Sequence, residues 1–297
     1  INEKLAQIRL VEATASGDMK KFKRYSEFIH GTPSLDVYVY TLQGIQEDVS
    51  RYLKSKNEYL RAAAEDMQQM LPQSIPQIKT RELPSAVDQA LVKQETLRDV
   101  DTLLQAAALE EKKVYTAQEI CEIFDVALQG MQAHGWTVVI DTESSRTAIN
   151  VNQEKKHITI PQSRQVTGEK LRGLLVHEVE THVNRRINGE RSKLQLLGLG
   201  LDRYTPGEEG IATMREQVLK EKPLEDFSGF DGHFAIGLAY GLGDQPKDFR
   251  QVYDILKHYY YIKKLAAKKP PEQSLAEAKI AAWKRCVRTF RGTDCAT

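Results

Sequence analysis

The chain has 297 residues, of which 41% are hydrophobic and 28% charged, and its formal net charge is +1. This composition is ordinary for a globular protein, and the length suffices for one large domain or two modest ones. No apolar run approaches the roughly 18–20 residues that a membrane-spanning helix needs, which excludes a transmembrane protein. The amphipathic start of mixed charge does not have the pattern of a signal peptide.

The cysteine content is low. Three widely spaced cysteines form neither a disulfide framework nor a Cys-based metal site: Cys121, Cys286 and Cys295. Since free thiols persist in a reducing compartment, we expect a cytoplasmic protein.

The first part of the chain predicts helices. They are expected over residues 1–30, 43–70, 85–111 and 116–134. The last opens with a capping-box pattern, Thr116 followed by Glu119. Between them, DVYVYTL (36–42) alternates like a strand or extended segment, and a stretch with three prolines (72–84) predicts a connector.

The second part begins with strands. Three short runs rich in β-branched residues follow one another at hairpin spacing: 136–141, 146–151 and 157–161. They predict a small antiparallel sheet, and 157–161 is a candidate edge strand for pairing with a substrate backbone. From Thr167 the apolar period becomes helical, and the chain after about residue 209 is mostly helical. The fold class is therefore α+β and mostly helical, with a helical region over 1–115 and a catalytic region over 116–297 that can form one compact unit with it.

The helix that follows these strands carries the pattern HExxxH, with His177, Glu178 and His182. The zinc-protease pattern HExxH places its histidines four residues apart, on one helix face. A spacing of five turns the second side chain about 140° around a regular helix, so the two imidazoles would diverge. One extra residue absorbed as a π-bulge restores their alignment, and we therefore predict a local helix defect between them.

A catalytic zinc ion needs a third protein ligand and an open position for water. The segment TPGEEGIATMRE (205–216) offers Glu208 and Glu209 where a new helix begins. Glu178, beside the metal, would take the proton from water. A strictly regular helix would instead pair Glu178 with His182, a spacing that resembles the carboxylate and histidine ligands of di-iron bundles.

Four segments together resemble the QEGLA-motif metallopeptidase family, which includes microtubule-associated tyrosine carboxypeptidases and bacterial flavohaemoglobin expression-modulating relatives. They are INVNQEKKHITIP (149–161), HEVETHVNRRING (177–189), EEGIA (208–212) and CVRTFRG (286–292). The resemblance implies a gluzincin-like fold with the sheet beside the HExxxH helix. It also implies one zinc ion bound by His177, His182 and Glu209, and Glu178 as the catalytic acid and base. The sequence departs from the family pattern at three positions: Glu180, Glu208 and Ile211.

The resemblance further implies removal of a C-terminal residue, which is tyrosine from the tubulin tail in the animal members. A cation must then bind the terminal carboxylate of the substrate, and the candidates are Arg185, Arg288 and Arg291. Candidates for the oxyanion donor are His233 and Tyr240. Ten Lys and Arg residues against two Glu between Lys257 and Arg291 would suit an acidic protein tail.

Two other functions remain open. One is a non-enzymatic regulatory or scaffold protein with a structural or lost metal site, and the other is an oxygen-activating di-iron protein using Glu178, His182 and Glu209. No nucleic-acid motif and no membrane partner is indicated.

Overall fold

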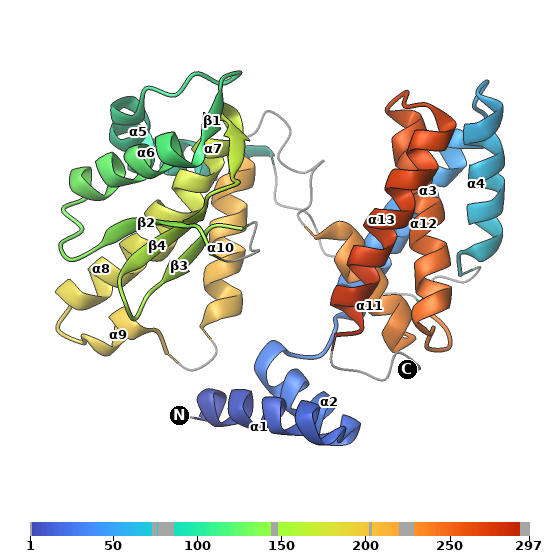
Figure 1. Cartoon of the computed structure of the whole chain (residues 1–297), viewed down its shortest axis with the longest axis horizontal. Helices are drawn as coiled ribbons and strands as arrows, with labels where there is room; N and C mark the ends of the chain where they lie inside the picture. The colour runs from blue at the N-terminus through green and yellow to red at the C-terminus, as the bar shows by residue number, and fades with distance from the viewer. Residues whose placement is uncertain are drawn as a thin grey trace. The chain divides into compact units, whose positions relative to one another are not determined.

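The computed structural model describes residues 2–72, 76, 86–143, 148–201, 204–219 and 229–291, with side chains omitted at 86–89, 102 and 106. The chain forms two compact units (Figure 1). The helical unit combines residues 1–81 with 229–297, and the mixed unit contains residues 82–228. Among the described residues, helices dominate and the sheets are small, which confirms the α+β class. None of the described helices is long and apolar enough to cross a membrane.

The described part of the helical unit consists of helices. They are α1 (Asn2–Ser16), α2 (Met19–His30), α3 (Leu35–Tyr52), α4 (Glu58–Met70), α11 (Phe230–Tyr240), α12 (Phe249–Ala266) and α13 (Pro271–Thr289). α3 packs on α4 and α11, while α12 packs on α4 and α13. The core between them includes the fully buried side chains of Leu42, Met67, Phe234 and Leu256.

The predicted extended segment at 36–42 is wrong, because these residues open α3. The Ser34 hydroxyl caps this helix by accepting a hydrogen bond from the backbone N–H of Val37. Buried residues at steps of three and four, Tyr38, Leu42, Ile45 and Val49, continue the helical period along its whole length. The alternation over seven residues is too local to decide against this longer pattern.

The helices predicted over 1–30 and 43–70 are each divided in two. Gly17 adopts a positive φ of 68° and Asp18 then caps α2, because its side chain accepts a hydrogen bond from Lys21 N–H. Asn57 caps α4 in the same way, through Leu60 N–H. Most of the predicted connector (72–84) and Cys295 lie outside the described residues.

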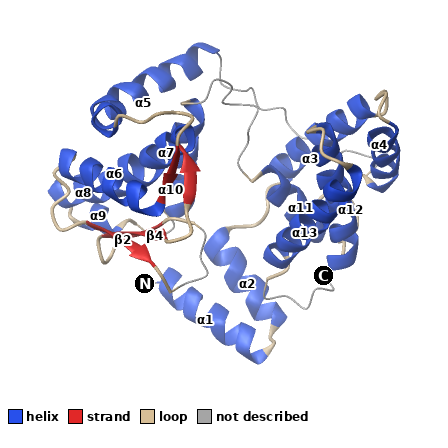
Figure 2. Cartoon of the chain, turned by 45° about the horizontal axis from the view of Figure 1, so that its top comes forward, coloured by secondary structure: helices blue, strands red, loops and turns tan. Residues whose placement is uncertain are grey.

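The mixed unit packs helices against its strands (Figure 2). Its elements are α5 (Ala86–Ala107), β1 (Val114–Thr116), α6 (Ala117–Gly130), β2 (Thr137–Asp141), β3 (Asn150–Asn152), β4 (His157–Pro161), β5 (Gln165–Thr167), α7 (Gly168–Leu174), the π-helix η1 (Leu175–Val183), α8 (Asn184–Arg191), α9 (Leu196–Leu199) and α10 (Thr205–Val218). The predicted capping box of α6 is confirmed, since Thr116 and Glu119 each accept a hydrogen bond from the other's backbone N–H.

The three-stranded sheet differs from the prediction. Its order is β2-β4-β3, with β4 antiparallel to β3 but parallel to β2, so the sheet is mixed. β4 carries Ile158 and Ile160, both fully buried, whereas Val139 of β2 is exposed. The most apolar strand therefore takes the central position, and 157–161 cannot be the edge strand; β3 lies at that edge. β1 and β5 form a separate antiparallel pair.

The predicted helix defect is confirmed, because the whole segment from Leu175 to Val183 is a π-helix. Its apolar side packs into a core with Phe124 of α6 and Ile160 of β4. Its other contacts include α10 and β3. η1 is therefore held between the sheet and α10, which fixes the direction in which its polar side chains project.

The two units do not coincide with the predicted regions 1–115 and 116–297. The helices after residue 229 pack with α3 and α4, while α5 packs with α6 and α10. The order of the elements in the sequence does not predict this boundary, because helices from the two ends of the chain bury their apolar faces in one common core.

Candidate metal centre

The π-helix brings the two histidines of the HExxxH pattern to one side. The ring centroids of His177 and His182 lie 5.2 Å apart, and both residues line the same cavity with Glu178. The buried hydroxyl of Thr181 donates a hydrogen bond to the carbonyl of Val176, five residues earlier. The wider turn therefore satisfies its own polar groups.

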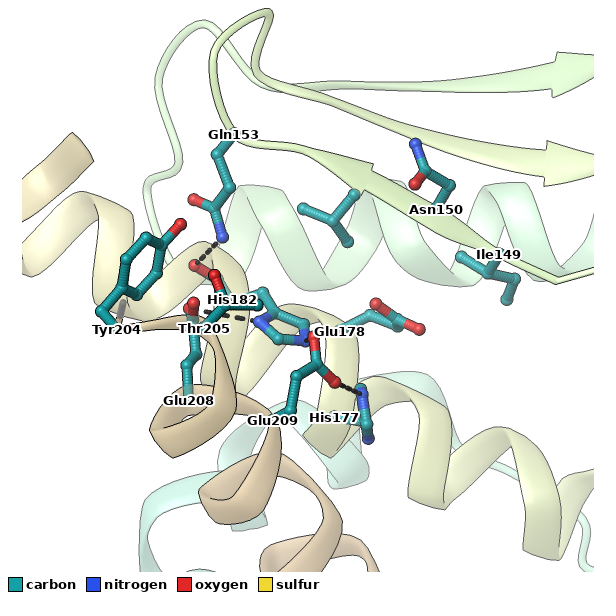
Figure 3. A pocket seen from close by; sticks show the side chains of 11 residues that line it. Ile149, Asn150, Gln153, His177, Glu178, His182, Tyr204, Thr205, Glu208 and Glu209 are labelled. Atoms are coloured by element: carbon teal, nitrogen blue, oxygen red, sulfur yellow. Dashed lines mark hydrogen bonds and ion pairs between the residues drawn. The ribbon is translucent and has the colours of Figure 1, made fainter. Parts of the chain in front are cut away.

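Glu209, in the first turns of α10, lies between the two rings (Figure 3). Its two carboxylate oxygens are each 3.5 Å from an Nε2 atom, Oε2 from His177 and Oε1 from His182. Two ligands at zinc–nitrogen distances of a tetrahedral ion are about 3.3 Å apart. Both nitrogen-to-oxygen distances are close to this separation, and two imidazoles with a carboxylate are donor types found at zinc sites.

Each imidazole meets a second carboxylate at its other nitrogen. Nδ1 of His182 lies 3.1 Å from Oε1 of Glu208, and Nδ1 of His177 lies 3.3 Å from Oε2 of Glu216. The His177 contact has ion-pair distance without hydrogen-bond alignment. Carboxylates in these positions fix the orientation of metal-binding histidines and raise their basicity. Sequence reasoning missed Glu216, although it follows Glu209 by two helical turns on α10 and shares its face.

Glu178 lines the cavity beside the histidines. Burial raises the pKa of its carboxyl group, while the nearby imidazoles lower it. One ligand atom from each of Glu178, His177 and His182 fits within 4.8 Å of the others. A carboxyl group whose pKa is raised toward neutrality, next to a metal site, is suited to exchanging protons with water and substrate.

The carboxylates around His177 and His182 favour a positive charge in the candidate metal centre. The carboxylate of Glu209, and after it that of Glu216, lie against the ring of His177 and raise its pKa to about 10. In turn His177 lowers the pKa of Glu209. Carboxylates around two imidazoles stabilise a cation among them, and a divalent metal ion satisfies this demand with the imidazoles neutral. The donor set of two imidazoles and one carboxylate is that of many catalytic zinc sites.

The cavity has a volume of about 380 Å³. β3 and its flanks contribute Ile149, Asn150, Val151 and Gln153 to one wall, and the start of α10 contributes Tyr204 and Thr205. The Gln153 amide donates a hydrogen bond to the backbone carbonyl of His182 at 3.2 Å. The edge strand is thereby tied to η1 beside the metal ligands.

The predicted substrate residues are distributed between the two units. Arg185 belongs to the mixed unit but bonds to Glu208 instead of lining the cavity. The other four lie in the helical unit and their roles stay predictions: Arg288, Arg291, His233 and Tyr240. Glu180 is buried away from the cavity lining, where its side chain accepts a hydrogen bond from Asn184 and its backbone carbonyl accepts one from Arg215.

Comparison with known proteins identifies the family of the chain. A family model of microtubule-associated tyrosine carboxypeptidases matches residues 80–267, which include every residue of the centre. No curated protein and no solved structure gives a match. The matched segment covers more than half of the chain and confirms the resemblance that the motifs indicated. The chain belongs to the microtubule-associated tyrosine carboxypeptidase family.

Proposed function

We propose that the chain is a zinc-dependent carboxypeptidase that removes a C-terminal residue, of the tyrosine type, from a protein tail. Membership of a peptidase family supports hydrolysis. The single observation that carries the metal assignment is the convergence of two Nε2 atoms, from His177 and His182, on the carboxylate of Glu209. This arrangement exists only because η1 is a π-helix.

When bound, a zinc ion would lower the pKa of water and polarise the peptide carbonyl. His177, His182 and Glu209 would hold it, with Glu216 and Glu208 orienting the two imidazoles. Glu178 accepts a proton from the attacking water and delivers it to the nitrogen of the departing amino acid, so the peptide bond breaks without net proton loss. Its raised pKa supports both directions of transfer.

The proposed substrate is an acidic protein tail such as that of tubulin, in the cytoplasm. Support comes from the family description and from the basic segment between Lys257 and Arg291. Several of these cations are already paired: Lys264 and Lys269 with Glu277, and Arg285 with Asp231. Arg288 is exposed at the end of α13, and its predicted role in binding a terminal carboxylate stays a prediction.

The two alternatives have less support. The di-iron function requires a regular helix that pairs Glu178 with His182, and η1 is not a regular α-helix. A non-enzymatic scaffold with a structural zinc ion needs no cavity and no raised carboxyl pKa beside the metal, and both are present.

The test combines metal analysis with peptide digestion. Purified protein should contain about one zinc ion per chain. Incubated with peptides that differ in their last residue, it should release single C-terminal amino acids, detected by mass spectrometry, and should leave amidated peptides intact. Glu178→Gln should retain zinc and lose at least about a hundredfold in rate. Glu169→Gln, on the exposed face of α7, is the matched control and should cleave normally.

Internal cleavage would replace the exopeptidase assignment with an endopeptidase. Iron in place of zinc would favour the di-iron alternative. No cleavage of any peptide by zinc-loaded protein would favour the scaffold.

A further inference from the structure

Two of the three nitrogens of the Arg185 guanidinium donate hydrogen bonds within the protein. Its Nε donates to Oε1 of Glu208 at 2.6 Å, and its Nη1 donates to the carbonyls of Leu197 and Gly198 at 2.9 and 3.0 Å. The guanidinium also stacks 4.6 Å from the ring centroid of Tyr204. Nη2 has no hydrogen-bond partner among the described residues, but it is buried. An arginine held by three acceptors and a ring is fixed in place, and its remaining nitrogen is not open to a substrate carboxylate.

Glu208, which accepts the shortest of these hydrogen bonds, also contacts His182 of the candidate metal centre. The Glu208 side chain is only 7% exposed, and the oxygen that accepts from Arg185 also lies 3.1 Å from Nδ1 of His182. If Nδ1 carries the proton for this contact, the lone pair of the neutral ring is on Nε2, the atom that faces Glu209. Arg185, Glu208 and His182 thus form a continuous relay from α8 through α10 to the ligand atom.

We propose that Arg185 is a positioning residue of the metal centre: through Glu208 it holds His182 with Nε2 directed at the metal ion. This inference rests on the metal site of the proposed function, and it removes Arg185 from the candidates for binding the substrate's terminal carboxylate. The cation for that task must come from elsewhere.

The two histidines differ in this respect. Glu216, beside His177, is 29% exposed and not aligned for a hydrogen bond with Nδ1. Glu208 is buried and anchored by a charged partner, so the His182 ring is the more firmly preorganised of the two. Disturbing the relay should therefore affect metal binding before it affects substrate.

The experiment measures zinc affinity in competition with a chromophoric chelator, in the absence of peptide. Arg185→Gln and Glu208→Gln should each weaken zinc binding about ten- to a hundredfold. Both substitutions break the same relay. The zinc affinity of the double variant should therefore equal that of the single variant with the lower affinity. Arg185→Lys should restore part of the affinity. Visible absorption of the cobalt-substituted protein should shift in both single variants, since it reports ligand geometry.

The matched control is Arg186→Gln on the same helix. Arg186 donates to the carboxylate of Glu190, which contacts neither histidine in the described contacts. Its loss removes a comparable ion pair but should leave zinc affinity unchanged. Thermal unfolding of each zinc-free variant identifies any variant that has lost its fold.

Unchanged zinc affinity in Arg185→Gln, with a raised KM for peptides carrying a free carboxylate, would show that Arg185 binds substrate and overturn the proposal. Additive losses in the double variant would also overturn it. If zinc affinity falls as expected but the unmodified protein cleaves no peptide, the positioning role stands and the carboxypeptidase fails. Absence of zinc binding in the unmodified protein refutes both.

Discussion

Gly189 of α8 lies against the backbone of α9 so closely that no side chain fits. A Cβ atom there would be 2.2 Å from the backbone nitrogen of Gly198. The Gly198 carbonyl is one of the acceptors that hold Arg185. The absence of a side chain at Gly189 therefore allows α9 to lie where its carbonyl groups hold the guanidinium of Arg185.

Gly189→Ala should destabilise the mixed unit by about 1–3 kcal/mol, because the backbones of α8 and α9 must move apart. The same change at Gly130, where a Cβ would meet nothing within 4 Å, should instead stabilise α6 by up to about 1 kcal/mol. Urea unfolding of both variants measures the difference. Equal effects of the two changes would contradict the close approach.

At the residue scale, the sequence predicted the proposed metal ligands better than the residues that contact and orient them. Of the proposed ligands, His177 and His182 follow from one motif, and Glu209 from the resemblance. Glu216 was not predicted, because its contact with His177 depends on how α10 is rotated about its axis relative to η1. The sequence of α10 alone does not reveal this rotation. Arg185 is one of three sequence candidates for the substrate carboxylate because it lies one helical turn beyond His182. Its partner Glu208 belongs to another element, and the sequence does not show that the two meet.

Among the elements, η1 brings to one side two histidines that are five residues apart, whereas a regular helix does this for a spacing of four. The extra residue widens the turn, and the flanking helices α7 and α8 continue on either side. Strand order was less predictable than helix type. Hairpin spacing correctly paired β3 with β4, but placing β2 beside β4 requires knowing which strand is most deeply buried.

Deleting Glu180 converts HEVETH to HEVTH. In a regular helix this spacing of four places both imidazoles on one face, so the deletion variant should bind zinc within about tenfold of the parent. Deleting Asn188 from the regular turn of α8 should rotate the following residues by about 100° and destabilise the unit. Circular dichroism and chelator competition test both. Loss of zinc binding in the Glu180 deletion alone would show that the π-helix cannot be replaced.

The capping box of α6 provides a prediction for pH. The backbone N–H of Thr116, followed by Lys113 at 3.0 Å, lowers the pKa of Glu119 to about 2. A depressed folded pKa means that this stabilisation is present above the unfolded value of about 4.5 and is lost as the pH falls toward 2. Glu119→Ala should therefore lower the Tm at pH 7 and have little effect near pH 2. A constant difference in Tm across this range would contradict the assignment.

For the whole molecule, each unit contains one of the two tryptophans, Trp136 in the mixed unit and Trp283 in the helical unit. Every residue of the metal centre belongs to the mixed unit. Zinc at a hundred times its Kd should therefore stabilise that unit by about 2.7 kcal/mol. In a Trp283→Phe background, zinc should raise the unfolding midpoint reported by Trp136 fluorescence. No shift at saturating zinc would place the ion elsewhere.

The helical unit is discontinuous in sequence, and this affects its synthesis. α3 and α4 leave the ribosome early, yet their buried partners in α11 and α12 follow only after all of residues 82–228. At about 5–20 residues per second this is a delay of about 7 to 30 s. During that time the contiguous mixed unit can fold, whereas the part of α3 that packs on α11, including Tyr38 against Phe234, stays without its native partner. Nascent chains stalled before residue 229 should therefore bind chaperones through α3, and those extended past α13 should release them.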